Sequence, residues 1–230
     1  MKCVVLQPSY IPWRGYFDQI YKADTFIFYD DVQYDKHGWR NRNRIKTANG
    51  TTWLTIPVTS QGNVSNHTPI NEIRIRSNDN WKKKHLLSIK YAYSKAPFFD
   101  DVYPVLEEIY QLDTELLSEF TIASTIRLAK YLGINDTKFV LSSELGVDGK
   151  KTDRLIDLLK AANADHYISG PSAKDYIEYD KFDAAGIFLE FMEYEYAEYP
   201  QLYPPFDPQV SVIDLLFMTG REASGQIWKK

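Results

Sequence analysis

The chain has 230 residues, of which 44% are hydrophobic and 15% aromatic, so it can bury a core of its own. Its net charge of −4 argues against a nucleic-acid coat protein, which needs a basic face, and we do not expect nucleic acid as a partner. The single cysteine, Cys3, excludes an intramolecular disulfide and a multi-cysteine zinc site. No signal peptide and no apolar run of roughly 20 residues is seen, so we expect a cytoplasmic protein without a membrane span.

The first 29 residues predict a strand, a helix and a second strand. Residues 2–7 contain a continuous apolar run, which is typical of a strand buried on both faces, and Pro8 and Pro12 interrupt it. Residues 13–23 carry apolar side chains at helical spacing, and residues 25–29 form a second apolar run. This order predicts the first half of a parallel α/β sheet.

The middle of the chain predicts a hairpin followed by helices. Asn49 and Gly50 form a typical turn pair before the strand-like residues 51–58, so this part is expected to be antiparallel. A polar loop is predicted over 61–69 and a half-exposed strand over 70–76. Three helices then follow, the third capped by Asp113, and they predict a helical insertion at about 80–134.

The sheet pattern returns in the last hundred residues. Strands are predicted over 138–142, 166–169 and 187–191, with helices over 152–164 and 212–218. A Tyr- and Pro-rich loop separates the strand predicted over 187–191 from the helix predicted over 212–218. We therefore predict one α/β domain over 1–230, with a mainly parallel, Rossmann-like (HUP-like) sheet.

Polar residues follow the predicted strands where ligands collect in open parallel sheets. Gln7 and Tyr10 come after the first strand, and Asp30 and Asp31 come directly after the second. An exposed carboxylate there suits a catalytic base, a sugar-hydroxyl acceptor or a magnesium ligand, although a charge pair with nearby arginines is the alternative. With His37, these two aspartates are the catalytic candidates, and no dedicated metal site is predicted.

An acid-free basic run follows at 36–46. In a strand, Arg40, Arg42 and Arg44 would share one face while Asn41 and Asn43 share the other. Three guanidinium groups on one face suit a phosphate. The alternative is a solvated edge strand whose arginines pair with Asp30, Asp31 and Asp35.

The predicted substrate-binding residues combine this run with two strand ends and one helix start. A helix start offers free N–H groups to an anion, and Gly15 there permits either close approach of a ligand or close packing. At the later strand end, Gly170 is free to take a positive φ and Ser172 is placed to cap a helix. The full set is Gln7, Tyr10, Trp13, Gly15, Tyr16, Trp39, Arg40, Asn41, Arg42, Asn43, Arg44, Ser169, Gly170, Ser172 and Lys174.

Several ordered motifs resemble one family. They are QPSYIPWRGYFDQIYKAD, FYDDVQY, WRNRNRIK, WLTIPV, ADHYISGPSAKDYI, YPQLYPPFDP and SVIDLLF, and the resemblance is to the WbqC-like family of bacteria. Members of that family lie in gene clusters for O-antigen and other surface polysaccharides, so the resemblance implies a role in making an unusual sugar. A weaker similarity links the first strand, loop and helix to HUP-type nucleotidylyltransferases, but Trp13 and Tyr16 stand where those enzymes have histidines.

The resemblance and the residues together lead to one expected function and two rivals. We expect an enzyme that transfers a small acyl or aminoacyl group to a nucleotide-linked amino sugar, with a sugar nucleotide as substrate and a nucleotide as the possible cofactor. The first rival is a non-catalytic nucleotide-sugar-binding or scaffold protein of the same pathway. The second, single-stranded RNA binding through the basic aromatic run, requires affinity that falls steeply with salt.

Overall fold

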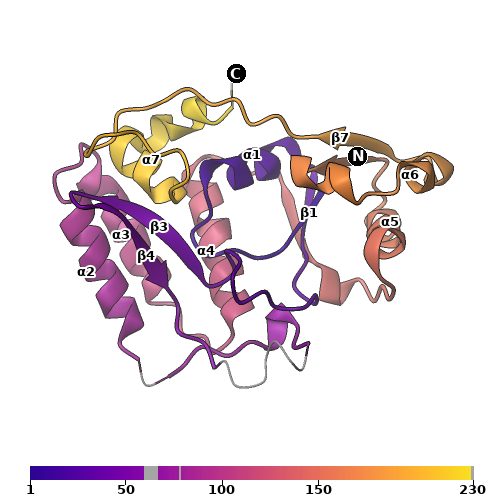
Figure 1. Cartoon of the computed structure of the whole chain (residues 1–230), viewed down its shortest axis with the longest axis horizontal. Helices are drawn as coiled ribbons and strands as arrows, with labels where there is room; N and C mark the ends of the chain where they lie inside the picture. The colour runs from indigo at the N-terminus through magenta and orange to yellow at the C-terminus, as the bar shows by residue number, and fades with distance from the viewer. Residues whose placement is uncertain (60–66, 78, 229–230) are drawn as a thin grey trace.

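The computed structural model describes residues 1–59, 67–77 and 79–228. Five strands form a wholly parallel sheet in the order β5-β2-β1-β6-β7 (Figure 1). Their bounds are Lys2–Leu6 (β1), Thr25–Phe28 (β2), Lys138–Leu141 (β5), His166–Ser169 (β6) and Phe188–Phe191 (β7). The predicted α/β class and Rossmann-like sheet are therefore confirmed. Within the described residues, no helix is both long enough and apolar enough to cross a membrane.

The strand order contains a topological switch point. The chain builds outward from β1 through β2 to β5, and then returns to the other side of β1 to form β6 and β7. Connections therefore leave β1 and β6 in opposite directions, although these two strands are neighbours. A crevice opens beyond the carboxyl ends of such a strand pair, and ligands bind there in open α/β sheets.

Apolar residues cover both faces of the sheet. Val4 joins the larger core cluster together with residues of α1 (Arg14–Lys22) and α4 (Leu117–Tyr131). Cys3 and Val5 point to the other side, into a smaller cluster with α5 (Lys151–Ala161) and α6 (Tyr179–Ala185). The continuous apolar run of β1 follows from this double burial, because neighbouring residues of a strand face opposite layers.

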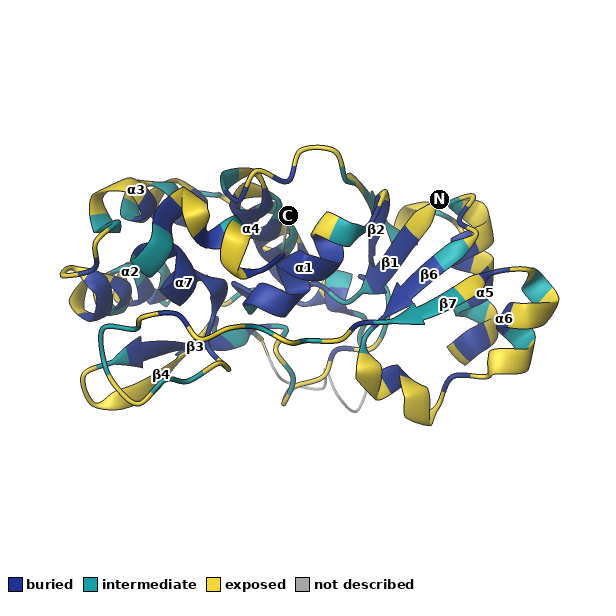
Figure 2. Ribbon diagram, turned by 90° about the horizontal axis from the view of Figure 1, so that it is seen from above, coloured by how far each residue is buried: buried dark blue, intermediate teal, exposed yellow. Residues whose placement is uncertain are grey.

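The predicted hairpin and helices form a second group of elements. Strands β3 (Arg42–Thr47) and β4 (Gly50–Thr55) are antiparallel, and Gly50 takes a φ of 98° in their turn. Figure 2 shows this hairpin with α2, α3 and α7 at one end of the molecule and α5 and α6 at the other. The helices are Trp81–Tyr93 (α2), Phe99–Tyr110 (α3) and Val212–Thr219 (α7). Helices α2, α3 and α4 lie within residues 80–134, between β4 and β5 in the chain.

Two local predictions are wrong. Residues 70–76 do not form a strand, because Ile70–Glu72 is a 3-10 helix (η1) and only isolated bridges at Arg74 and Ile75 follow. Pro69 precedes η1, and the Ile70 and Asn71 amides donate to Val32 and Asp30 carbonyls, which ties this segment to the exit of β2. The helix after Asp113 begins at Leu117, where the Thr114 hydroxyl, rather than Asp113, accepts from a backbone amide. Most of the predicted loop over 61–69 lies outside the described residues.

Three further 3-10 helices are Ser142–Glu144 (η2), Pro171–Asp175 (η3) and Gly220–Gln226 (η4). Residues 192–211, here called the strap, run from β7 to α7 over α1 (Figure 1). The strap is fastened to α1 because Arg14 Nη1 donates to the Ala197 carbonyl at 2.9 Å and Tyr196 donates to Asp18 at 2.7 Å. The strap therefore forms one wall of the space beyond the carboxyl ends of β1 and β6.

Candidate functional site

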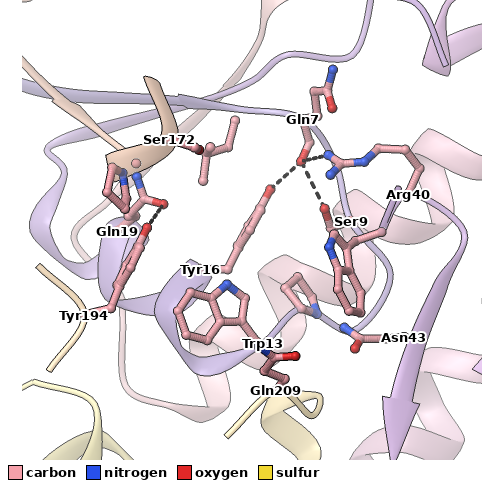
Figure 3. Close-up of a pocket in the computed structure, with 15 residues that line it drawn as sticks. Gln7, Ser9, Trp13, Tyr16, Gln19, Arg40, Asn43, Ser172, Tyr194 and Gln209 are labelled. Carbon is pink, nitrogen blue, oxygen red and sulfur yellow. Dashed lines mark hydrogen bonds between the residues drawn. The ribbon is translucent and has the colours of Figure 1, made fainter. Parts of the chain in front are cut away.

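A cavity of about 470 Å³ lies beyond the carboxyl ends of β1 and β6, at the switch point of the sheet (Figure 3). Five parts of the chain contribute to it: the end of β1 and the loop after it, α1, the start of β3 with the segment that leads into it, the start of η3, and the strap. Its lining residues are Leu6, Gln7, Ser9, Pro12, Trp13, Tyr16, Gln19, Trp39, Arg40, Asn43, Gly170, Pro171, Ser172, Tyr194 and Gln209.

Arg40 supplies the positive charge of this lining, which includes no carboxylate. Its Nη1 donates to the Gln7 carbonyl at 3.2 Å and to the Pro8 carbonyl at 3.4 Å. Arg40 forms no salt bridge with any described residue. Burial lowers its pKa, while nearby Tyr16 and Asp35 oppose that shift. A partly desolvated guanidinium without an acidic partner favours binding of an anion.

Aromatic rings form the walls around Arg40. Tyr16 donates from its hydroxyl to the Gln7 carbonyl at 3.1 Å, which holds the ring at the end of β1. Trp13 packs edge-on against Tyr194, with ring centroids 4.9 Å apart. Flat apolar walls of this kind suit the faces of sugar and base rings.

The structure decides the role of Gly15 in favour of packing. A Cβ atom on Gly15 would lie 2.3 Å from Cζ2 of the Trp13 ring, so the indole occupies the space that a side chain would need. Gly15 itself is not a lining residue. It allows Trp13 to lie against the start of α1 and thereby to shape the cavity wall.

Two nitrogen donors of lining residues are buried without a partner among the described residues. Gln19 accepts from the Tyr194 hydroxyl at 2.9 Å through Oε1, which leaves its Nε2 unpaired. Arg40 Nε is also unpaired. An unsatisfied buried donor costs about 1–3 kcal/mol. An acceptor oxygen supplied by a bound molecule would remove this cost after small side-chain movements.

Asn43 fastens the loop that follows β1. Its Nδ2 donates to the carbonyls of Tyr10 and Ile11 at 3.1 and 2.9 Å, and Tyr10 N donates to the Trp39 carbonyl at 3.1 Å. Ile11 has a φ of 34°, which is an unfavourable region for a β-branched residue. These bonds hold a strained loop against the cavity, as occurs at binding sites.

The cavity brings together eight of the predicted binding residues. They are Gln7, Trp13, Tyr16, Trp39, Arg40, Asn43, Gly170 and Ser172. Two details of the prediction are wrong: Gly170 has an ordinary φ of −69°, and Ser172 makes no capping bond in η3. Ser169 is buried at the end of β6, and Lys174 lies with its Nζ 5.2 Å from the Phe191 ring centroid.

Tyr10 lies in the core instead of the cavity. It is fully buried, its hydroxyl is 2.8 Å from His85 Nδ1, and it also contacts the Tyr110 hydroxyl. Tyr10 is therefore a core residue of the helical region. It does not line the cavity and cannot stack on a ligand there.

The three arginines of the basic run do not converge on one point. Arg42 and Arg44 share a face of β3, as predicted, but both lie over the Trp53 ring, at 4.6 and 5.7 Å from its centroid. Arg42 also donates to the His37 carbonyl, and Arg44 donates to the Gln209 carbonyl. Only Arg40 of the three lines the cavity.

The predicted catalytic residues also lie apart from the cavity lining. Asp30 accepts from both the hydroxyl and the amide of Ser143, at 2.8 and 3.1 Å, and from the Ser142 hydroxyl. Asp31 pairs with Arg154, so the alternative pairing with Arg40, Arg42 or Arg44 is not seen among the described residues. His37 is exposed, and its catalytic role and those of the two aspartates remain predictions.

Several lining residues were not predicted from the sequence. Gln19 lies inside an amphipathic helix, where periodicity alone assigns no function. Tyr194 and Gln209 belong to the strap, which the sequence marked as a Tyr- and Pro-rich loop without assigning it a role. No group of three or more His, Cys, Asp or Glu residues in the described part of the chain could hold a metal ion.

Comparisons with known proteins identify the family. The model of the WbqC-like protein family matches residues 7–226. The uncharacterized protein Rv1507c of Mycobacterium tuberculosis (strain ATCC 25618 / H37Rv) is 41% identical over 224 residues, which cover 96% of this chain and 95% of that protein. No solved structure gives a significant match. The chain belongs to the WbqC-like protein family.

Proposed function

We propose that this WbqC-like protein modifies a nucleotide-linked amino sugar during surface-polysaccharide synthesis, by transferring a small acyl or aminoacyl group to it. The pathway is what the family resemblance described above implies, and the group transfer is the reaction that we expect from the residues and the resemblance together. The part that rests on geometry is the binding of an anionic, ring-containing molecule in the cavity at the switch point.

One observation carries the proposal: Arg40 lines an aromatic cavity without a carboxylate partner. A nucleotide sugar combines phosphates, which pair with a guanidinium, and rings, which pack on Trp13, Tyr16 and Trp39. The volume of about 470 Å³ lies in the usual range for small-molecule sites, about 300–1,000 Å³. The unpaired Nε2 of Gln19 adds a donor for a hydroxyl or carbonyl oxygen.

The proposed reaction forms one bond and breaks another. The amine nitrogen of the sugar attacks the carbonyl carbon of an activated donor, the new C–N bond forms, and the bond to the leaving group breaks. The amine loses a proton, which must pass to a base or to the departing group. Holding both reactants in one cavity would itself contribute to the rate.

The lining also favours a second candidate function. It contains no Asp, Glu, His, Lys or Cys residue, and burial raises the pKa of Tyr16 and Tyr194 above the ordinary value of a tyrosine. No lining side chain is therefore poised as a general base near neutral pH. This supports a non-catalytic protein that holds a nucleotide sugar for other enzymes of the same pathway.

Both candidate functions require that the cavity binds a nucleotide sugar. Calorimetric titration with a panel of nucleotide-activated amino sugars tests this binding. We expect one of them to bind the wild type, and Arg40→Gln to weaken that binding at least about tenfold, because a charge-assisted hydrogen bond contributes about 1.5–3 kcal/mol. Arg74→Gln is the matched control, because Arg74 is an exposed arginine paired with Glu115 and lies outside the cavity lining. If no sugar nucleotide binds, or both variants bind like the wild type, the proposal fails.

Activity separates the two candidates. The bound sugar is incubated with activated acyl donors and the products are analysed by mass spectrometry. An enzyme yields an acylated sugar, and the predicted roles require His37→Ala and Asp30→Asn to reduce its formation while binding persists. Unchanged function of both variants in cells would instead support the non-catalytic protein. His37 is exposed, so its variant is expected to fold normally.

A further inference from the structure

A second hollow, of about 310 Å³, lies beside the basic run and shares no lining residue with the first cavity. Lys36, His37, Arg42 and Arg76 contribute to its lining, and no carboxylate does. Two nearby acidic residues have partners: Asp35 accepts from the His37 amide at 2.9 Å, and Asp79 pairs with Lys84 at 3.1 Å and with Arg76 at 3.8 Å. Like charges around one hollow repel each other, and a bound anion relieves that repulsion.

The position of Arg42 is fixed from two sides. Its guanidinium lies 4.6 Å from the centroid of the Trp53 ring, and Nη2 donates to the His37 carbonyl at 2.6 Å. Its Nε is buried and has no partner among the described residues. Arg42 therefore contributes a fixed guanidinium charge and an unpaired N–H donor, Nε, to the hollow.

Asn41 adds an unpaired acceptor. Its side chain is 6% exposed, and Nδ2 donates to the Ile56 carbonyl at 2.9 Å, which fixes the orientation of the amide. Oδ1 is then an acceptor, and it is buried without a partner among the described residues. A fully deprotonated anion has no hydrogen to donate to it, whereas a hydroxyl group can donate one.

We propose that this hollow is a second ligand site, which takes a small molecule that carries both a phosphate and hydroxyl groups. Arg42, Arg76 and Lys36 contact the phosphate, and Asn41 Oδ1 accepts from a hydroxyl. The volume matches the lower end of small-molecule sites, about 300 Å³, so the site suits a sugar phosphate rather than a larger nucleotide sugar.

Titration calorimetry with ribose 5-phosphate and with inorganic phosphate tests the site. We expect saturable binding of ribose 5-phosphate, at least about fivefold tighter than that of inorganic phosphate, because the sugar phosphate places its phosphate against the cations and a hydroxyl against Asn41 at the same time. Arg76→Gln and Lys36→Gln, each a change at the surface of the hollow, should each weaken both probes at least about threefold. Thermal melts check that both variants fold.

Two control variants locate the binding. Arg74→Gln, outside both lining sets, should leave ribose 5-phosphate binding unchanged, whereas a loss caused by Arg40→Gln would place binding in the first cavity. The proposal is overturned if the wild type binds neither probe, if Arg74→Gln weakens binding as much as Arg76→Gln does, or if only Arg40→Gln weakens it. Equal affinity for the two probes would overturn the role of Asn41. None of these results depends on whether the first cavity binds a sugar nucleotide.

Discussion

Asp18 shows at the scale of one residue how burial changes a carboxyl group. Its Oδ2 accepts from the Tyr196 hydroxyl at 2.7 Å, while Oδ1 is buried without a partner among the described residues. Burial raises its pKa above 3.8, and the hydrogen bond from Tyr196 and the charge of Lys22 oppose this only in part. The folded protein therefore keeps the Asp18 proton to a higher pH than the unfolded chain does.

Because of this raised pKa, the free energy of unfolding depends on pH. In the window above 3.8 and up to the raised pKa, the folded state binds more protons, so the free energy of unfolding falls as the pH rises. Asp18→Asn removes this titration, and we expect its stability to fall less than that of the wild type as the pH rises through this window. Urea denaturation across this range measures it. The control is Asp113→Asn, at an exposed position, whose stability should follow that of the wild type. The prediction is contradicted if the stability of Asp18→Asn changes with pH in the same way as that of the wild type.

Gly15 gives a second prediction at this scale. Replacing a helical glycine by alanine normally stabilises a protein by roughly 0.5–1 kcal/mol. Here the new Cβ would lie 2.3 Å from the Trp13 ring, so we expect Gly15→Ala to lower the free energy of unfolding by about 1–3 kcal/mol. Chemical denaturation measures the loss, and a double-mutant cycle with Trp13→Phe should show coupling of at least about 0.5 kcal/mol. A stabilised Gly15→Ala variant would show that the indole does not occupy this space.

The strap contributes Tyr194 and Gln209 to the cavity lining. Tyr194 lines the cavity and donates to Gln19 at 2.9 Å. Tyr194→Phe leaves the Gln19 amide without that donor, and we expect ligand affinity in the cavity to fall about three- to tenfold, because the loss of one hydrogen bond costs about 0.5–1.5 kcal/mol. Calorimetric titration with the sugar nucleotide measures it. Tyr203→Phe is the matched control, since Tyr203 belongs to the same strap but donates to Ala92 and does not line the cavity. Equal effects of the two variants would contradict a specific role for Tyr194.

Elements with one dominant signal were predictable from the sequence. The apolar run of β1 and the Asn49-Gly50 turn lead to the observed strand and hairpin, because buried strands and tight turns have local requirements. The strand predicted over 70–76 failed for the opposite reason. Its alternation of apolar and polar residues also suits η1, whose backbone is held by bonds to the distant residues Val32 and Asp30.

At the scale of the whole molecule, the strand order predicts which distant segments respond to a ligand. The carboxyl ends of β1 and β6 are adjacent although they lie far apart in the chain. We expect hydrogen exchange of amides near Ser9 and near Ser172 to slow together when a ligand fills the cavity, while α2 and α3 are unchanged. Exchange measured with and without the sugar nucleotide tests this, and protection of only one of the two strand ends would contradict it.

Only part of the site could be predicted from the sequence. Gln7, Trp13 and Arg40 were found because strand ends and basic runs are visible in the sequence. Tyr10, two residues before Pro12, looked equivalent to them but points into the helical core against His85. Gln19 and Tyr194 were missed because their contact joins a helix to a segment 175 residues away, and local patterns contain no such information.

The distribution of the cavity wall along the chain has a consequence for protein synthesis. The wall extends from Leu6 to Gln209, so a ribosome must translate the chain as far as Gln209 before all residues of the wall are present. A nascent chain that has passed β6 but lacks the strap contains Gln19 and Arg40 but not Tyr194. Premature termination before the strap therefore yields polypeptides that lack part of the cavity wall.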